Sequence, residues 1–346
     1  MPTFVRTQDI EHRIGPDGQL SLRLTSPDVE LRGVDGDTAR VRIEFEVRAP
    51  SDVEADQAFD RMKFSVDQGD GRLEVAEPRR GSDGLASIAS ILGLGSSRWE
   101  ASVVAEVPRR TAVRFNGVSG DLTARGLTGP QGYRTVSGDL VLSGLAGSVD
   151  VNGVSSDVSL RADAPVSLRA TTVSGDLSIF APRLDEARVT TVSGDVELEG
   201  HLAPEGSHRV ETVSGDLSLG IVGGLTLEVR GLSSEVHVQL PHRSEGSRDR
   251  RRYVIGDGSV RLQFSSMSGD ASVHAPRRMA ASPTPPTPPT PPTAPTPPAP
   301  ATMATAPTPA ARTISETEQL EVLRALERGE IDVDEATRRL GGAADA

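Results

Sequence analysis

The sequence predicts a mainly β protein: a parallel β-solenoid with an α+β N-terminal cap, a Pro-rich linker and a C-terminal helical hairpin. The first observation behind this prediction is the tetrapeptide Val-Ser-Gly-Asp, which returns about every 19 residues through the middle of the 346-residue chain. The second is the alternation of apolar and polar residues beside each tetrapeptide, which is typical of a half-buried strand. The third is a content of 35 glycines, which suits a fold with many tight corners. A fixed period of this size indicates one supersecondary unit stacked on itself.

Each copy of the tetrapeptide is predicted to form the same corner of one coil. Five full copies and a late copy, Met267–Asp270, are accompanied by two degenerate copies, Val154–Asp157 and Leu232–Glu235. Successive acids are 18 to 21 residues apart, except for a last step of 35 residues, which is nearly two ordinary steps. The predicted structural corner comprises Gly120, Asp121, Gly138, Asp139, Asp157, Gly175, Asp176, Gly194, Asp195, Gly215, Asp216, Glu235, Gly269 and Asp270.

Within one unit the parity of the residues predicts which side chains face the core. Val173, Leu177 and Ile179 share one parity and are expected to point inward, while the serines and the acid between them face water. A second short strand follows, in which Val189 precedes the next motif valine, Val192, by an odd step of three residues. This break in parity indicates a corner. Successive coils are expected to stack as parallel strands about 4.8 Å apart.

The region of residues 1–110 is predicted to be a strand-rich cap, followed by the repeats in residues 111–277. Residues 20–25 and 41–48 alternate apolar and polar side chains, which predicts two strands. The sequence Asp-Gly-Asp at 35–37 supplies a turn between them.

A short helix is predicted over Ser51–Met62. Ser51 is placed to cap its N-terminus, and Glu54 stands three residues later, as in a capping box. The apolar stripe of this helix comprises Ala55, Ala58, Phe59 and Met62.

An insertion at residues 81–97 carries Leu85, Ile88, Ile91 and Leu92 at helical spacing. Two interpretations are open: a short helix that covers an open end or edge of the sheet, or a peripheral contact with a partner or lipid surface through residues 84–94. The segment is too short to cross a bilayer.

Beyond the repeats the composition changes twice. The polar stretch Arg243–Arg252 is predicted to be a solvated hairpin loop that accounts for the 35-residue gap between acids. Residues 278–312 are mostly Pro, Thr and Ala, which predicts an extended polyproline linker.

Residues 313–346 are predicted to form a helical hairpin. Ser315 and Glu318 make a capping box for its first helix. A piece this small buries too little apolar area to be firmly stable alone. We therefore expect it to bind a protein partner or to self-associate, through Leu320, Leu323, Leu326 and Leu340.

The repeated acid has three candidate roles: a structural corner, a cation ladder, or a row of catalytic carboxylates. Ser156 and Ser234 replace the glycine and Glu235 replaces the aspartate, which a shared chelating ladder would tolerate badly. An active site also needs a few unlike groups that converge, rather than one residue repeated. The structural corner is favoured, and no catalytic residue, cofactor or metal site is predicted. His237, His242 and His274 are expected to be surface histidines rather than zinc ligands.

Composition excludes several function classes. The net charge of −12 opposes non-specific binding to nucleic acid or anionic lipid, and the aromatic content of 3% opposes base-stacking platforms. The absence of cysteine excludes disulfides and thiolate metal sites. Neither a secretory h-region nor a run of about 18 apolar residues is present, which predicts a cytoplasmic protein.

These residues resemble the bacterial putative-adhesin domain of unknown function, which is built from β-strand repeats. The shared features are the Val-Ser-Gly-Asp-Leu/Val periodicity, the segment Asp28–Asp37 and the lead into the first repeat, Ala105–Val113. The resemblance covers about residues 10–277. The tail Glu321–Leu340 resembles the short SHOCT-like helical domain, which accompanies this repeat in proteins linked to envelope stress.

The resemblance implies a non-enzymatic solenoid. The sequence thus favours an interaction scaffold whose hairpin recruits a protein partner or a second copy. Two alternatives stay open: a self-assembling structural rod or filament, and a carbohydrate-active or calcium-binding solenoid.

Overall fold

The computed structural model describes residues 2–78, 99–231, 234–247 and 250–276. All of them belong to one compact unit, residues 1–281. The predicted contact segment 84–94, the Pro-rich linker and the C-terminal hairpin, with its four leucines, lie outside the described residues.

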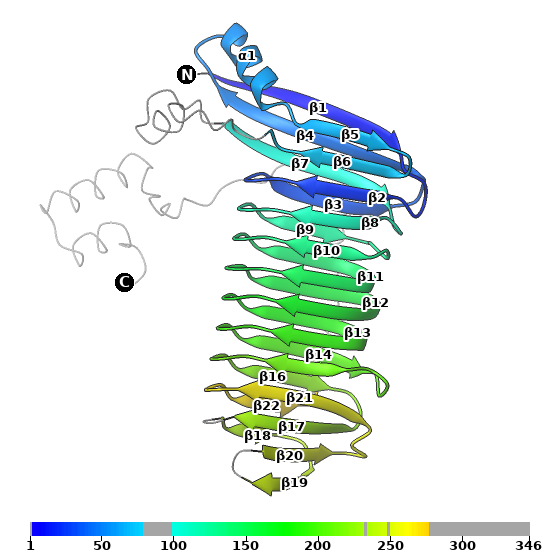
Figure 1. Ribbon diagram of the computed structural model, residues 1–346, viewed down its shortest axis with the longest axis vertical. Helices are drawn as coiled ribbons and strands as arrows, with labels where there is room; N and C mark the ends of the chain where they lie inside the picture. Colours follow the sequence, from blue (N-terminus) through cyan, green and yellow to red (C-terminus); the bar gives the residue numbers. More distant parts are fainter. Residues whose placement is uncertain (1, 79–98, 232–233, 248–249, 277–346) are drawn as a thin grey trace, which may run out of the picture. The chain divides into compact units, whose positions relative to one another are not determined.

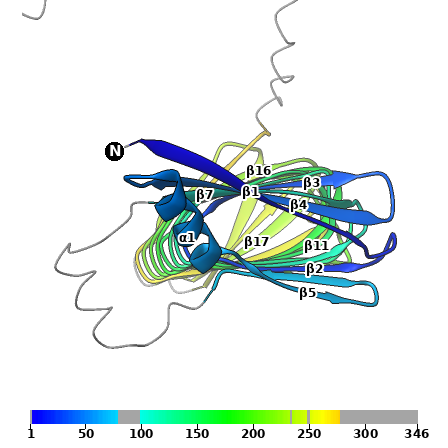
Figure 2. The ribbon, with the colours of Figure 1, turned by 90° about the horizontal axis from the view of Figure 1, so that it is seen from above.

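The strands form one mixed sheet that winds around a core as a β-solenoid, so the predicted fold class is confirmed (Figure 1). The winding gives the sheet two opposed faces, which we call face A and face B (Figure 2). Three long strands, β11 (Leu140–Asn152), β12 (Val158–Thr171) and β13 (Leu177–Thr190), run from face A into face B. In spatial order, face A contains β1 (Thr3–Arg13), β4 (Thr38–Arg48), β7 (Trp99–Pro108), β3 (Asp28–Val34), β9 (Leu122–Arg125), the first parts of β11, β12 and β13, then β14 (Val196–Leu202), β16 (Leu217–Ile221), β22 (Ala271–His274) and β18 (Val236–Val238).

Face B is ordered in the same way from one end of the stack to the other. It contains β5 (Ser65–Gly69), β6 (Arg72–Ala76), β2 (Gln19–Arg23), β8 (Ala112–Asn116), β10 (Gln131–Arg134), the second parts of β11, β12 and β13, then β15 (His208–Glu211), β21 (Val260–Ser266), β17 (Leu225–Gly231), β20 (Arg250–Ile255) and β19 (His242–Ser247).

One coil consists of a strand on face B, a corner, and a strand on face A. The corner contains the tetrapeptide, so β8 leads through Val118–Asp121 into β9, and the next coil follows the same path. Strands at successive levels pair in parallel; for example, Tyr133 lies opposite Phe115 and Val151. The strands β2 and β3 form a coil of the same geometry, because they pair in parallel with β8 and β9.

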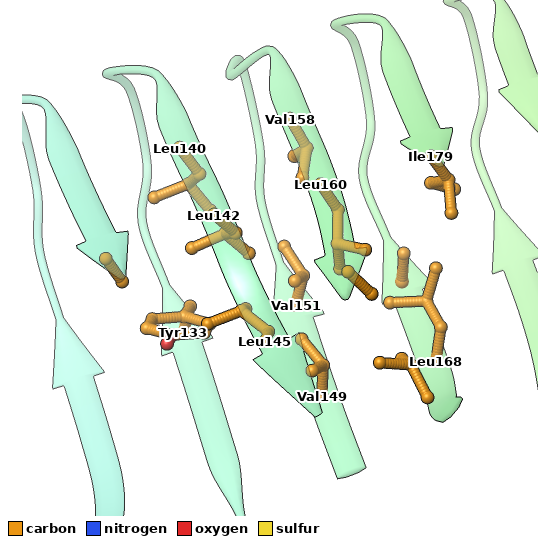
Figure 3. Packing of buried hydrophobic residues seen from close by; sticks show 14 of the residues in the cluster. Tyr133, Leu140, Leu142, Leu145, Val149, Val151, Val158, Leu160, Leu168 and Ile179 are labelled. Atoms are coloured by element: carbon orange, nitrogen blue, oxygen red, sulfur yellow. The ribbon is translucent and has the colours of Figure 1, made fainter. Parts of the chain in front are cut away.

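The core is made of aliphatic columns between the two faces. Alternate residues of each strand point inward, as Leu140 and Leu142 do in β11 and Val158 and Leu160 do in β12 (Figure 3). Because the same position recurs at every level, each buried side chain packs on its counterpart above and below.

One polar pair lies within this core. The hydroxyl of Tyr133 donates to Oε1 of Gln131 at 2.9 Å, and the amide of Gln131 donates to main-chain carbonyls such as that of Gly129. Burial raises the pKa of Tyr133, so its hydroxyl stays protonated and remains a donor.

The coils at the C-terminal end are stacked out of chain order, which the sequence interpretation missed. On face B, β21 lies between β15 and β17, and on face A, β22 lies between β16 and β18. The coil that contains Met267–Asp270 therefore lies between the coil of Val213–Asp216 and the coil of Glu235. The 35-residue gap reflects this return of the chain rather than a loop alone.

The stretch predicted as a solvated loop, Arg243–Arg252, belongs instead mostly to the two strands of a hairpin. β19 pairs antiparallel with β20, and β20 pairs antiparallel with β17, so the hairpin extends face B. Polar side chains did not prevent strand formation here because both strands expose most of them to solvent.

The N-terminal cap contains the predicted helix, α1 (Asp52–Met62). Ser51 caps it as expected, since its hydroxyl accepts the N–H of Glu54 at 3.3 Å. The rings of Phe59 and Phe64 pack edge-on against Phe45 of β4.

The turn at Asp35–Asp37 joins β3 to β4, but these two strands are not neighbours. β7 lies between them and pairs with β3 in parallel and with β4 antiparallel. Among the residues that the structure describes, no helix combines the length and apolar character that a membrane crossing requires.

Candidate functional site

The repeated acids form a continuous ladder along one edge of the solenoid, where face B turns into face A. The carboxylate of each acid accepts the backbone N–H of the acid one level on. Asp121 accepts from Asp139 at 2.8 Å, and Asp176 accepts from Asp195 at 2.8 Å. In spatial order the ladder contains Asp28, Asp121, Asp139, Asp157, Asp176, Asp195, Asp216, Asp270 and Glu235.

This arrangement gives the repeated aspartate a structural explanation. Neighbouring carboxylates about 4.8 Å apart repel each other by roughly 0.9 kcal/mol in water. Each of them gains a charge-assisted hydrogen bond from a backbone amide that the corner leaves without a ladder partner. The ladder is thus a device that satisfies backbone donors at the corner.

The same geometry explains the glutamate. Glu235 donates its N–H to Asp270 at 2.7 Å, but its own carboxylate accepts no backbone N–H from a further level of the described chain. A longer side chain is tolerated at this level because nothing depends on its length.

The sequence interpretation of the motif valine was wrong. Val173 does not point inward with Leu177; it is 48% exposed, whereas the preceding Thr172 is buried. The inward alternation of the face B strand continues through the threonine, and the hydroxyl of Thr172 donates to the carbonyl of Ser174 at 3.2 Å. Thr135 and Thr191 make the same bond, so a buried threonine holds the corner from inside.

The glycine of the corner is required by close packing between levels. At Gly194 φ is +131°, and an added Cβ would lie 2.2 Å from the carbonyl oxygen of Gly175. The two copies with serine in place of glycine are compensated three residues earlier. Gly153 stands where Thr172 stands in the full copy, and a Cβ at Gly153 would lie 2.3 Å from Oγ of Ser156.

The second degenerate copy shows the same exchange. A Cβ at Gly231 would lie 2.4 Å from Oγ of Ser234. Four corners thus hold a threonine and a glycine, and the two degenerate corners hold a glycine and a serine, whereas the first copy has Gly117 with Gly120 and the late copy has Ser266 with Gly269. This exchange is visible in the printed sequence and was missed.

The outward motif residues form what we call the valine column. It runs beside the acid ladder over seven consecutive levels, and its members are 43% to 56% exposed. The column consists of Val118, Val136, Val154, Val173, Val192, Val213 and Met267.

The described unit contains a shallow hollow beside the C-terminal end of the ladder. It has a volume of about 520 Å³ and lies on the outer surface of face A. Its wall contains Asp216, Asp270, Glu235 and His237. Within the described residues, no group of three or more His, Cys, Asp or Glu side chains is arranged to hold a metal ion.

The structure thus places the predicted glycines and acids of the corner in two parallel columns, beside a third column of serines. Ser155, Ser174 and Ser193 are joined by parallel bridges from level to level. The predicted partner-binding residues Leu320, Leu323, Leu326 and Leu340 lie outside the described residues.

The sequence profile of the Toastrack DUF4097 family matches residues 17–274, which is most of the chain. The chain belongs to this family. The match covers the coils from β2 to β22, which contain the acid ladder and the valine column. None of the curated proteins compared with the chain matches it.

The solved structures that match this Toastrack protein share little sequence with it. A putative cell adhesion protein from Clostridium sporogenes is 9% identical, with 78% of this chain and 99% of that chain covered and a TM-score of 0.24. A putative adhesin from Parabacteroides merdae is 13% identical, with 78% and 96% covered and a TM-score of 0.25. A putative lipid binding protein from Parabacteroides distasonis is 12% identical, with 78% and 97% covered and a TM-score of 0.32.

Proposed function

We propose that this Toastrack protein is a non-enzymatic, adhesin-like scaffold that presents a regular surface to other macromolecules. The observation that supports this proposal is the acid ladder. Eight of its nine carboxylates accept a backbone N–H of the next level, from Asp28 through Asp270. The most regular polar groups of the molecule therefore serve the fold.

The geometry of the corner also opposes a catalytic role. A catalytic pair of carboxylates needs two unlike environments, so that one group is protonated and the other ionised. The carboxylates of Asp176 and Asp195 have the same environment, since each accepts the backbone N–H of the next acid, at 2.8 Å and 2.9 Å. Such a series provides rigidity and repeated contact, which suit a scaffold.

We further propose that the C-terminal hairpin is the recruiting element of the scaffold. Its sequence predicts an apolar stripe of Leu320, Leu323, Leu326 and Leu340 on a module too small to be stable alone. The Pro-rich sequence before it predicts a spacer that lets the hairpin reach a partner protein. The SHOCT-like resemblance is the basis for proposing that the scaffold itself acts in the response to envelope stress.

The test uses three full-length chains, each as bait in native lysate, and compares the proteins that they retain. The variant carries Leu323→Arg and Leu326→Arg, and the matched control carries Leu323→Met and Leu326→Met. We expect a defined partner to be retained by the wild type and the control, to be lost from the arginine variant, and to bind the purified wild-type chain. Identical retention by all three chains would contradict recruitment by the hairpin.

A second arm tests the absence of catalysis. A panel of bacterial polysaccharides is incubated with the wild type and with the Asp176→Asn, Asp195→Asn variant. We expect no turnover by either protein. Turnover that the double substitution abolishes would show that the carboxylates are catalytic and would overturn the proposal.

A further inference from the structure

The valine column is an organised apolar surface. Of the twelve large hydrophobic side chains that are exposed in the described residues, seven lie in this one column, and the other five are Val5, Val53, Val66, Val141 and Val222. Scattered apolar side chains are normal on a protein surface, but a contiguous line of them indicates an interaction site.

The spacing of the column restricts what can cover it. Its side chains recur once per level, about every 4.8 Å. An α-helix repeats every 5.4 Å, so over six levels its side chains fall about 4 Å out of register with those of the column. An extended chain presents the same side every 6.6 to 6.8 Å, so its side chains fall about 11 Å out of register. Another stack of parallel strands has the same repeat and stays in register along the whole column. A second copy of this solenoid satisfies that requirement.

The two flanks of the column carry opposite charge. On one side lies the acid ladder, with one carboxylate at every level. On the other side lies the outer surface of face B, where six arginines stand among three acids of the same seven levels, Asp150, Glu186 and Glu211. Glu186 and Glu211 already pair with arginines of the same flank. The arginines are Arg114, Arg134, Arg169, Arg188, Arg209 and Arg261, and all six are exposed. Arg261 pairs with Glu228 of the neighbouring β17.

The order of these columns selects one orientation of the second copy. A two-fold axis parallel to the stack would bring the two valine columns together and place each acid ladder opposite the partner's arginine flank. A two-fold axis perpendicular to the stack, in the plane of the contact, would place ladder against ladder. Because opposed rows of like charge are unfavourable, the parallel arrangement is preferred.

We infer that two copies of this protein associate side by side and parallel, with valine column on valine column and each acid ladder facing the partner's arginines. The seven levels span about 29 Å at 4.8 Å per level. A stable interface buries about 800 Å² on each partner, which requires a strip about 28 Å wide along this length. The contact must therefore include both charged flanks as well as the column.

Disulfide trapping in the full-length chain tests the orientation, because the protein has no cysteine of its own. Single variants carry Val118→Cys, Val173→Cys or Met267→Cys. The control is Val141→Cys, since Val141 is 44% exposed and Val173 is 48% exposed, but Val141 lies on the outer surface of face A. In the parallel pair each column residue meets its own counterpart, so all three variants are expected to form disulfide dimers at least ten times faster than the control.

Mass measurement gives a second and independent readout. The wild-type chain of 36.4 kDa should have twice this mass in light scattering, and the mass should fall with dilution and with added salt. The pair Val154→Arg and Val192→Arg should weaken the dimer at least tenfold without changing the far-ultraviolet circular dichroism spectrum, whereas Val141→Arg should leave the dimer intact.

Three results would overturn the inference. The first is a wild-type chain that stays monomeric at high concentration, as it would if its own C-terminal tail covered the column. The second is trapping of Val118→Cys only when it is mixed with Met267→Cys, which indicates an antiparallel pair. The third is equal trapping at Val141. None of these results concerns the partner of the hairpin, so the proposed scaffold function is tested independently of the dimer.

Discussion

The middle of the solenoid and its C-terminal end contain the same corner but connect it differently. In the middle, Asp176 accepts the N–H of Asp195, which follows 19 residues later. At the C-terminal end, Asp216 accepts the N–H of Asp270, which follows 54 residues later. Both hydrogen bonds measure 2.8 Å. The tetrapeptide therefore specifies the geometry of one level but not which level of the chain is stacked next.

The free energy of chain connection is too small to enforce chain order. Closing a loop of 54 residues instead of 19 costs about 0.9 kcal/mol more by the logarithmic dependence on loop length. One buried aromatic side chain contributes several times as much. Side chains such as Phe264 in β21 can therefore decide where the last coil is placed.

The largest expected effect comes from removing that aromatic ring. Phe264→Ala should lower the free energy of unfolding by about 3–5 kcal/mol. Since β21 hydrogen-bonds to both β15 and β17, hydrogen exchange should also rise in β17 and β20. Phe115→Ala, at the equivalent position of the middle part, should cost a similar free energy in denaturant unfolding but leave exchange in β17 and β20 low. Equal exchange in the two variants would show that the ends are not separately stabilised.

The next effect concerns the two degenerate corners, of which one lies in the middle of the solenoid and the other at its C-terminal end. Gly153→Thr should cost about 1–3 kcal/mol, because the new side chain overlaps Ser156. Adding Ser156→Gly restores the threonine–glycine pair found in four of the five full copies and should recover most of the loss. Gly231→Thr with Ser234→Gly should behave in the same way at the C-terminal end. Rescue at only one of the two corners, measured by thermal unfolding, would show that the levels are not equivalent.

A smaller effect is expected from the ladder itself. Asp176→Ala and Asp216→Ala should each cost about 1 kcal/mol, because each leaves one corner N–H without its carboxylate in a solvent-exposed site. Asp176→Asn keeps an acceptor oxygen and should cost less. Glu235→Ala should have no measurable effect on denaturant unfolding, since the carboxylate of Glu235 accepts no backbone N–H from a further level of the described chain. A loss at Glu235 equal to that at Asp216 would contradict our account of the last level.

The smallest effect is a pH dependence that is confined to the C-terminal end. Asp257 lies in the turn from β20 to β21, and the backbone N–H and then the hydroxyl of Ser259 hold the pKa of its carboxyl below the usual value. Stability from a lowered pKa is present above the unfolded-state pKa and is lost as the pH falls through the folded-state pKa. The thermal midpoint of Asp257→Asn should therefore differ from that of the wild type at pH 6 and converge with it near pH 2. A difference that persists unchanged in acid would exclude this carboxylate as the cause.

Much of the architecture was predictable from local pattern. The period of the tetrapeptide predicted the solenoid, and Ser51 with Glu54 predicted the start of α1, because both signals depend on residues close in sequence. The order of the last two coils was not predictable, because each level offers the same hydrogen bonds to any neighbour. A placement of this kind depends on packing between residues far apart in the chain.

The corner shows a different limit. The acids and glycines were predicted to lie at one corner, but the direction of the motif valine was predicted wrongly. The prediction began its inward parity at Val173, although the buried Thr172 continues the parity of Leu168 and Ala170. Following the alternation through threonine would have placed Val173 outside and shown the valine column.

The interleaved coil also has a consequence for biosynthesis. While the ribosome has delivered the chain only as far as β20, the strands β15 and β16 on one side and β17 and β18 on the other still lack the neighbour that later separates them. Val260–Ser266 and Ala271–His274 must then enter between edges that are already formed, or those edges must first separate. Folding from the N-terminus can therefore proceed coil by coil only as far as β16, and the last step is an insertion that waits for the end of the domain to emerge.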